Sequence, residues 1–179
     1  MQHELIVVPD AAAVSRAAAE RVAVAAQAAV AERGAFSLAV CGGRSPWAMF
    51  ADLAELDVPW ESVEVYQVDE RVAPEGDPLR NLTHLRESLG PQLPVQVHPM
   101  PVEADDLERA ARDYAGDLPA TIDLIHLGLG SDGHTASLVP GDPILDVDDR
   151  LIAITGRAYQ GTHRMSMTYP QLSRTRGLL

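Results

Sequence analysis

The sequence predicts a doubly wound α/β domain with a mainly parallel, Rossmann-like sheet and helices on both faces. Three observations support this prediction. Short apolar runs, each the length of a buried strand, alternate with segments of helical composition. This alternation is typical of βαβ units, which build parallel sheets. Three loops rich in glycine or charge directly follow predicted strands, where ligands bind in such sheets. No linker or repeat divides the 179 residues, so we expect a single domain over residues 1–179.

The first half of the chain predicts three strands and three helices. Residues 11–33 are rich in alanine and form the longest predicted helix, with Asp10 as a plausible N-cap and Gly34 as a stop signal. The predicted elements, in order, are a buried strand at 5–8, a helix at 11–33, a strand at 36–40, a helix at 47–56, a strand at 63–68 and a helix at 81–89.

The second half continues the alternation. It predicts a weaker strand at 95–98, a helix at 105–117, a strand at 122–127 and further strands at 151–155 and 165–168. The final residues, 176–179, resemble the start of another buried strand. A domain rarely ends on such a strand, so we expect a C-terminal part of the fold to be absent from this sequence.

The composition is that of a globular protein, with 46% hydrophobic and 22% charged residues. The formal net charge of −12 disfavours nucleic acid and anionic membranes as partners. All 14 cationic residues are arginine, which excludes Schiff-base chemistry by a lysine of this chain. A phosphate clamp would therefore consist of arginine or backbone groups. No cluster of His, Cys and Asp has the spacing of metal ligands, so we predict neither metal nor cofactor.

Cys41 is the only cysteine, which excludes an internal disulfide framework. It follows the apolar run 37–40, so we expect a buried structural thiol. No apolar run approaches the about 20 residues of a membrane span. The N-terminal residues 1–4 lack the basic region of a signal peptide. We predict a cytoplasmic protein, and its oligomeric state stays open.

The first loop with a possible chemical role is Gly42–Pro46, which joins a predicted strand to a predicted helix. Gly42 and Gly43 allow the backbone to approach a ligand closely, and the helix N-terminus favours a phosphate. Arg44 can add charge and Ser45 a hydroxyl. The loop matches neither the Walker motif nor GxGxxG. A plain strand-to-helix turn is an equally good interpretation of this loop taken alone.

The second loop is the charged triplet Asp69–Arg71, at the end of the predicted strand 63–68. Charged side chains at the carboxyl end of a parallel strand can take part in catalysis. They can also form a solvated turn, and for this triplet alone the solvated turn is the favoured interpretation.

The third loop, Gly128–Ser137, gives the strongest functional signal in the chain. Its glycines permit tight backbone turns around Asp132 and His134. A histidine can accept a proton near neutral pH, and a neighbouring carboxylate can orient it and stabilise its charged form. A histidine that caps a helix is the weaker alternative. His98 and His126 lie in predicted strands, where we expect them to be packed.

Four segments together resemble a known family. They are residues 42–46, residues 69–74 with Asn81, residues 123–141 and residues 164–170. In this order they resemble the 6-phosphogluconolactonase family, which is related in fold to the glucosamine-6-phosphate deaminases. The segments span most of the chain, and the one around His134 is the most specific.

The resemblance implies hydrolysis of 6-phosphoglucono-δ-lactone to 6-phosphogluconate in the pentose phosphate pathway, with His134 as the general base that activates water. It places the 6-phosphate between the Gly42–Ser45 loop and Arg164, Asp69 near the sugar ring and Arg71 against the substrate. The catalytic residues implied are Asp69, Asp132 and His134. The substrate-binding residues implied are Gly42, Gly43, Arg44, Ser45, Arg71, Asn81, Gly130 and Arg164. Backbone N–H groups of the glycine-rich loops are expected to stabilise the oxyanion.

Two alternatives remain open at this point. A deaminase of the related family carries a glutamate where this chain has Val139, and usually a tyrosine where it has Arg71. Valine cannot exchange protons, so the difference favours the lactonase. The other alternative is a sugar-phosphate-binding module without turnover, because relatives continue past Leu179 into a region whose lysine is thought to reach the phosphate.

Overall fold

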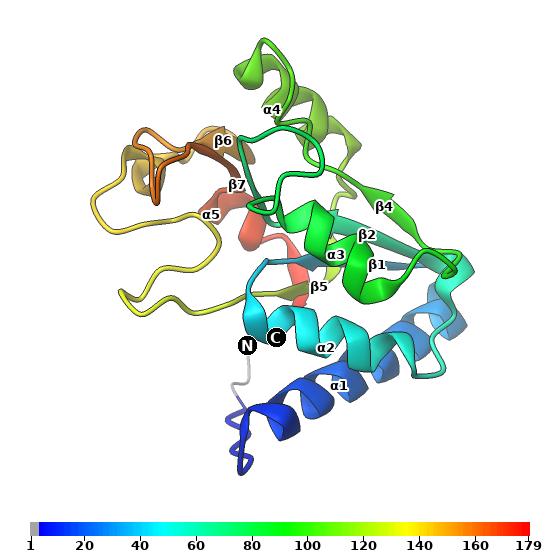
Figure 1. The fold of residues 1–179 in the computed structure, drawn as a ribbon. Coiled ribbons are helices and arrows are strands. Elements are labelled where there is room, and N and C mark those ends of the chain that lie inside the picture. The colour runs from blue at the N-terminus through cyan, green and yellow to red at the C-terminus, as the bar shows by residue number, and fades with distance from the viewer. Residues whose placement is uncertain (1–3) are drawn as a thin grey trace.

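A five-stranded parallel sheet forms the centre of the molecule, in a computed structural model that describes residues 4–179. Its strand order is β4-β2-β1-β5-β8, and all neighbouring strands run parallel (Figure 1). Val40 at the end of β1 lies level with Gln67 of β2 and His126 of β5, so three carboxyl ends meet at one edge. The strands are β1 Phe36–Val40, β2 Val63–Gln67, β4 Gln96–His98, β5 Ile122–His126 and β8 Thr175–Leu178. The predicted doubly wound, mainly parallel fold is confirmed.

A second, antiparallel sheet of three short strands adjoins this edge. It consists of β3 Asp69–Arg71, β7 Arg164–Met167 and β6 Ile152–Ile154, in the order β3-β7-β6. The interpretation of residues 69–71 as a loop was wrong. Backbone pairing with β7 overrides the weak strand propensity of this charged triplet. The pairing sets Arg71 opposite Arg164 and Asp69 opposite Ser166.

All four predicted helices are present, and α1 and α3 have the predicted limits, whereas both ends of α2 and the start of α4 differ from the prediction by two or three residues. Helix α1 begins after Asp10, whose Oδ1 accepts a hydrogen bond of 2.8 Å from Ala13 N, and ends at Gly34 with φ +80°. Helix α2 begins at Arg44 instead of residue 47, so Arg44 lies in its first turn. The helices are α1 Ala11–Arg33, α2 Arg44–Ala54, α3 Asn81–Leu89, α4 Leu107–Asp117 and α5 Tyr169–Leu172, with 3-10 turns at Trp60–Ser62 and Pro143–Asp146.

Side chains of β1 pack alternately into two cores, because successive residues of a strand point to opposite faces. Phe36, Leu38 and Val40 pack with α1, α2 and α3, whereas Ala39 and Cys41 pack with α4 and the second sheet. Figure 1 shows α1 and α2 along one side of the main sheet, with α4, β6 and β7 on the other. Helices therefore cover both faces, as predicted.

Of the two strands predicted near the ends of the chain, one is absent and one is present. The predicted buried strand at 5–8 is wrong, because Leu5 and Val7 are 89% and 82% exposed and no strand forms there. An apolar run becomes a strand only where a neighbouring strand pairs with it, and among residues 4–179 none pairs with this one.

The predicted strand at the C-terminal end exists as β8, which pairs with β5 at the edge of the sheet. Residues 1–3, on which the signal-peptide prediction partly rests, lie outside the described residues.

Within residues 4–179, no helix combines the length and the apolar character needed to cross a membrane.

Candidate active site

A cleft of about 290 Å³ opens at the carboxyl edge of the main sheet, and the three loops singled out from the sequence converge on it. From β1, the sheet grows through β2 and β4 toward one edge, and β5 and β8 are then added on the opposite side of β1. The direction in which strands are added therefore reverses between β1 and β5. Ligand sites of open α/β sheets form at such reversals. The cleft is lined by Cys41, Gly42, Gly43, Arg44, Ser45, Pro46, Asp69, Arg71, Asn81, Gly128, Leu129, Gly130, His134, Ala136 and Arg164.

His134 and Asp132 form a hydrogen-bonded pair within the loop after β5. Asp132 Oδ1 contacts His134 Nδ1 and accepts a hydrogen bond of 3.2 Å from its backbone N–H. The hydrogen bond from His134 is the main cause that lowers the pKa of Asp132. An ionised Asp132 places a proton on Nδ1, an assignment inferred from the contact, and leaves Nε2 as the basic nitrogen. The side chain of His134 is only 18% exposed.

Gly130 closes this loop from within. Its N–H donates to the carbonyl oxygen of His134 at 2.8 Å, and Gly133 N donates back to Gly130 O at 3.0 Å. A Cβ at position 130 would overlap the His134 ring. The His134 ring can therefore occupy this position only because residue 130 has no side chain.

Asp69 is a buried carboxylate held by several elements. Ser137 Oγ donates to its Oδ2 at 2.6 Å, Asn81 Nδ2 donates to its Oδ1 at 3.2 Å, and Arg164 Nη1 lies 4.0 Å from Oδ2. Burial raises the pKa of Asp69, although Ser137, Arg71 and Arg164 act in the opposite direction. The carboxylate thus links Asn81, which lines the cleft, to the buried Ser137.

Three arginines line the cleft and give it a positive character in a chain of net charge −12. Arg164 is 3% exposed, and burial, followed by the nearby Arg71, lowers the pKa of its guanidinium. Arg164 Nε has no hydrogen-bond partner within residues 4–179. Arg71 Nη1 donates to Leu79 O at 3.1 Å and contacts Asn81 Oδ1, and Arg44 lies exposed at the rim. A bound anion would supply the countercharge and acceptors that these groups lack.

The N-terminus of α2 lies at the same cleft, which Arg44 and Ser45 of its first turn line. Gly43 precedes the helix with φ +136°, and within residues 4–179 no side chain caps the first turn. Uncapped N–H groups and the helix dipole attract anions. A Cβ on Gly42 would overlap the Asn81 amide, so this approach of β1 to α3 requires glycine.

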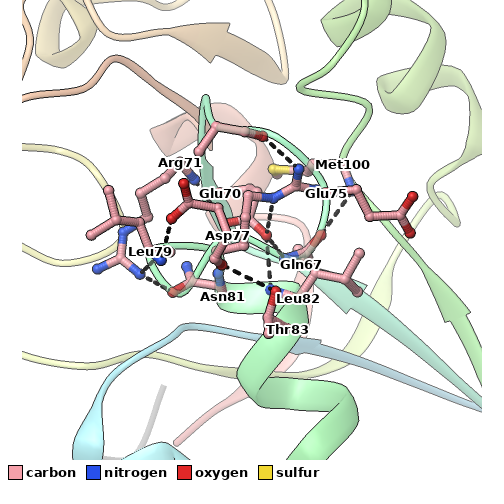
Figure 2. Close-up of polar contacts among 12 residues, drawn as sticks. Gln67, Glu70, Arg71, Glu75, Asp77, Leu79, Asn81, Leu82, Thr83 and Met100 are labelled. Carbon is pink, nitrogen blue, oxygen red and sulfur yellow. Dashed lines mark hydrogen bonds and ion pairs between the residues drawn. The ribbon is translucent and has the colours of Figure 1, made fainter.

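Glu70 organises the residues behind the cleft (Figure 2). Its fully buried carboxylate accepts backbone N–H groups of Arg71 at 2.7 Å, Asn81 at 2.7 Å and Leu82 at 2.8 Å, and it pairs with Arg80 Nε at 3.1 Å. It thereby caps α3 and fixes Asn81 beside Arg71. This role of Glu70 was not predicted from the sequence, because the helix that it caps begins 11 residues later.

The structure brings the candidate residues together. Ten of the eleven line the cleft, and Asp132 lies beside it against His134. Cys41 is buried, as expected for a structural thiol, and burial raises the pKa of its thiol. The roles of Glu70 and Ser137 were not predicted, because Asn81 and Asp69, the partners that define these roles, lie 11 and 68 residues away. Among residues 4–179, no group of three or more His, Cys, Asp and Glu side chains is placed to hold a metal ion.

The fold and the cleft define an α/β protein that places a histidine–aspartate pair beside three arginines at the carboxyl edge of a parallel sheet. The family model described as glucosamine-6-phosphate isomerases/6-phosphogluconolactonase matches residues 9–179, and the chain belongs to this family.

Relatives within the family share the lactonase name. A 6-phosphogluconolactonase of Synechocystis sp. is 38% identical over 165 residues, which cover 84% of this chain and 68% of the relative. A 6-phosphogluconolactonase of Mesorhizobium japonicum is 35% identical over 174 residues, which cover 92% of this chain and 73% of the relative.

Solved structures show the same fold. The crystal structure of a 6-phosphogluconolactonase from Shewanella baltica matches with a TM-score of 0.88 and 25% identity, over 96% of this chain and 77% of that one. A monomeric glucosamine-6-phosphate deaminase matches with a TM-score of 0.80 and 16% identity, over 96% and 78% of the two chains. The second match shows the fold alone.

Proposed function

We propose that this chain hydrolyses 6-phosphoglucono-δ-lactone to 6-phosphogluconate, a step of the pentose phosphate pathway. The observation that supports the proposal most is the His134–Asp132 pair, which shares one cleft with three arginines and the open end of α2. The substrate is an ester that carries a phosphate. Its hydrolysis requires a base at the ester and cationic or N–H groups around the phosphate, and this cleft contains both. The lactonase name of the relatives supports the same reaction.

The chemistry requires a base that can also return its proton. His134 Nε2 removes a proton from water as the water oxygen bonds to the lactone carbonyl carbon, and the carbonyl π electrons move onto oxygen. Collapse of this oxyanion breaks the bond to the ring oxygen, which takes the proton from His134. Asp132 stabilises the imidazolium between the two transfers, as its contact with Nδ1 implies.

Backbone N–H groups at the cleft are proposed to stabilise the oxyanion. The N–H of Gly130 is not among them, because it already donates to His134 O. Gly130 therefore acts on the substrate through the position of His134, and the donors come from other backbone groups of the lining loops.

The phosphate is proposed to bind between the first turn of α2 and Arg164, with Arg44 at the rim. Arg71 and Asn81 then face the sugar with Asp69 below them. Two observations support this arrangement: in the described part of the chain, the buried Nε of Arg164 and the first N–H groups of α2 are donors without a side-chain acceptor. The net charge of −12 makes such a local cluster necessary for any anionic substrate.

The deaminase reaction is disfavoured by Val139, where the deaminases that this chain resembles carry a glutamate. Its carbonyl oxygen accepts a turn hydrogen bond of 3.1 Å from Asp142 N, and its side chain offers no group for proton transfer. The shared fold does not separate the two activities, so the chemistry of the side chains decides.

We also propose that residues 1–179 belong to a single domain, and that the reaction takes place in the cytoplasm without metal or cofactor. Hydrolysis of a δ-lactone needs a base, a positioned water and a grip on the phosphate, and the cleft offers side chains for each.

The proposal is tested by assaying freshly generated 6-phosphogluconolactone with the parent protein, His134→Ala and the control His84→Ala. We expect hydrolysis by the parent and the control, and a loss of at least about a hundredfold in kcat for His134→Ala. Equal rates in all three proteins would contradict the role of His134. A folded parent that releases ammonia from glucosamine 6-phosphate instead would be a deaminase, and one that only binds 6-phosphogluconate would be a binding module.

A further inference from the structure

Tyr159 lies in the connection between β6 and β7, which folds back on itself as a tight hairpin. Tyr159 N donates to Thr162 O at 2.9 Å, and the two residues form an isolated β-bridge. Gln160 and Gly161 turn the chain with φ values of +54° and +88°. Thr162 Oγ1 anchors the turn by donating to Val72 O at 2.7 Å. The hairpin therefore holds Tyr159 in a defined place.

The ring of Tyr159 contacts two cleft residues that come from different elements. Its centroid lies 5.5 Å from that of the His134 imidazole, at an interplanar angle of 70°. The guanidinium carbon of Arg164 lies 4.9 Å from the same centroid, over the ring. Gln160 Oε1, the next residue in the hairpin, accepts from Arg164 Nη2 at 3.2 Å.

Both contacts have favourable geometry. An edge-to-face pair at this separation is attractive, and so is a cation above an aromatic face. Asp132 contacts the imidazole at Nδ1, and its other hydrogen bond goes to the backbone N–H of His134, so the ring can still pivot about the side-chain contact. Arg164 is anchored on its Nη2 side by Gln160 and has no partner at Nε within residues 4–179. The Tyr159 ring supplies the missing restraint to both.

We propose that Tyr159 is a positioning residue, whose aromatic ring fixes the His134 imidazole relative to the Arg164 guanidinium. The inference rests on the proposed lactonase function and extends it, because it links the proposed base, His134, to the proposed phosphate-binding residue, Arg164. The distance between these two groups decides whether a substrate held by its phosphate presents its carbonyl to the activated water. The hydroxyl of Tyr159 has no hydrogen-bond partner among the described residues. The contacts that position His134 and Arg164 are therefore made by the aromatic ring.

The test compares Tyr159→Ala, Tyr159→Leu and Tyr159→Phe with the parent, and uses Tyr169→Ala as a control at an exposed tyrosine of α5. Lactone hydrolysis is measured to give kcat and KM separately. We expect Tyr159→Ala and Tyr159→Leu to lose about ten- to a hundredfold in kcat/KM, with kcat lowered and KM raised. Tyr159→Phe should keep most of the parent's activity, and the control should match the parent.

A second measurement separates this inference from the lactonase proposal. Long-range ¹H–¹⁵N correlation spectra report the imidazole of His134 without turnover. We expect the ¹⁵N shifts of Nδ1 and Nε2, which follow the contact with Asp132 and respond little to a lost ring current, to change in Tyr159→Ala and Tyr159→Leu and to stay close to the parent's in Tyr159→Phe. An inactive parent with these shifts would contradict the lactonase function and leave the positioning role standing.

Three results would overturn the inference. One is parent-like kinetics or parent-like His134 resonances in both Tyr159→Ala and Tyr159→Leu. Another is an equal loss in Tyr159→Phe, which would assign the effect to the hydroxyl. The third is a fall in Tm in both Ala and Leu variants that accounts for their lost activity, since this would make Tyr159 a purely structural residue.

Discussion

Gly130 shows at the scale of one residue how the cleft depends on a side chain that is absent. Its N–H binds the carbonyl of His134, and a methyl group on its Cα would overlap the imidazole and lie 2.9 Å from Asp132 Oδ1. We expect Gly130→Ala to push His134 away from Asp132 and to lower kcat/KM about a hundredfold. Steady-state kinetics and a thermal melt measure the two effects separately.

Gly116→Ala is the matched control, because a Cβ at Gly116 in α4 would meet no atom within 4 Å. It should keep full activity and gain a little stability, as alanine favours a helix. Full activity in Gly130→Ala would show that the reaction does not need His134 in this place.

Residue-level prediction from the sequence succeeded where partners are close in the chain. Asp132 and His134 are two residues apart, and their pairing follows from the local sequence. Ser137 and Asp69 are 68 residues apart, and no local pattern joins them. Only the fold reveals that Asp69 is a buried, hydrogen-bonded carboxylate and not part of a solvated turn.

At the scale of elements, helix α3 depends on a carboxylate from β3. Both oxygens of Glu70 accept backbone N–H groups, Oε1 from Arg71 and Asn81 and Oε2 from Leu82. Neither orientation of a glutamine amide satisfies these donors, because one of them would face an NH₂ group. We expect Glu70→Gln to lower the free energy of unfolding by about 3 kcal/mol, measured by urea denaturation.

The control is Glu103→Gln, which changes another carboxylate partner of Arg80. Glu103 lies 2.8 Å from Arg80 Nη1 but its side chain is 46% exposed. Water reaches the Glu103 carboxylate, and Arg80 keeps Glu70 as its buried partner, so this variant should lose less than about 1 kcal/mol and remain close to the parent. Equal unfolding curves for both variants would contradict the capping role of Glu70.

Elements were predictable where their boundaries are marked by local chemistry. Asp10 and Gly34 define α1, and its observed limits match the prediction. The failures concern strands, because a strand exists only through its neighbours. Residues 5–8 are apolar but unpaired among the described residues, whereas the charged 69–71 pair with β7. Tertiary pairing decided both cases against the composition of the segment.

At the scale of the whole molecule, His126 makes the stability of the sheet depend on pH. It lies in β5 at the centre of the fold, and its Nδ1 is buried with no hydrogen-bond partner within residues 4–179. Burial lowers the pKa of His126 from its ordinary value of 6.5 to about 4. Between these values the unfolded chain binds a proton that the folded chain does not.

Stability should therefore fall as the pH decreases from 6.5 toward 4, because protonation favours the unfolded state in this window. Between pH 7 and pH 5 the loss due to His126 amounts to about 2 kcal/mol. Asp69 has the opposite effect on stability. Its pKa is raised in the folded state, so as the pH falls the folded chain binds this proton before the unfolded chain does. A comparison with His126→Leu removes this contribution, because Asp69 is present in both proteins.

Urea denaturation at pH 7 and pH 5 gives the free energy of unfolding of the parent and of His126→Leu. We expect the parent to lose about 2 kcal/mol more than the variant over this interval. The absolute stability of the variant does not enter, so any repacking around the leucine cancels in the difference. Parallel pH profiles would mean that His126 is protonated equally in both states. The centre of the sheet would then be open enough to solvent for the imidazole to titrate freely.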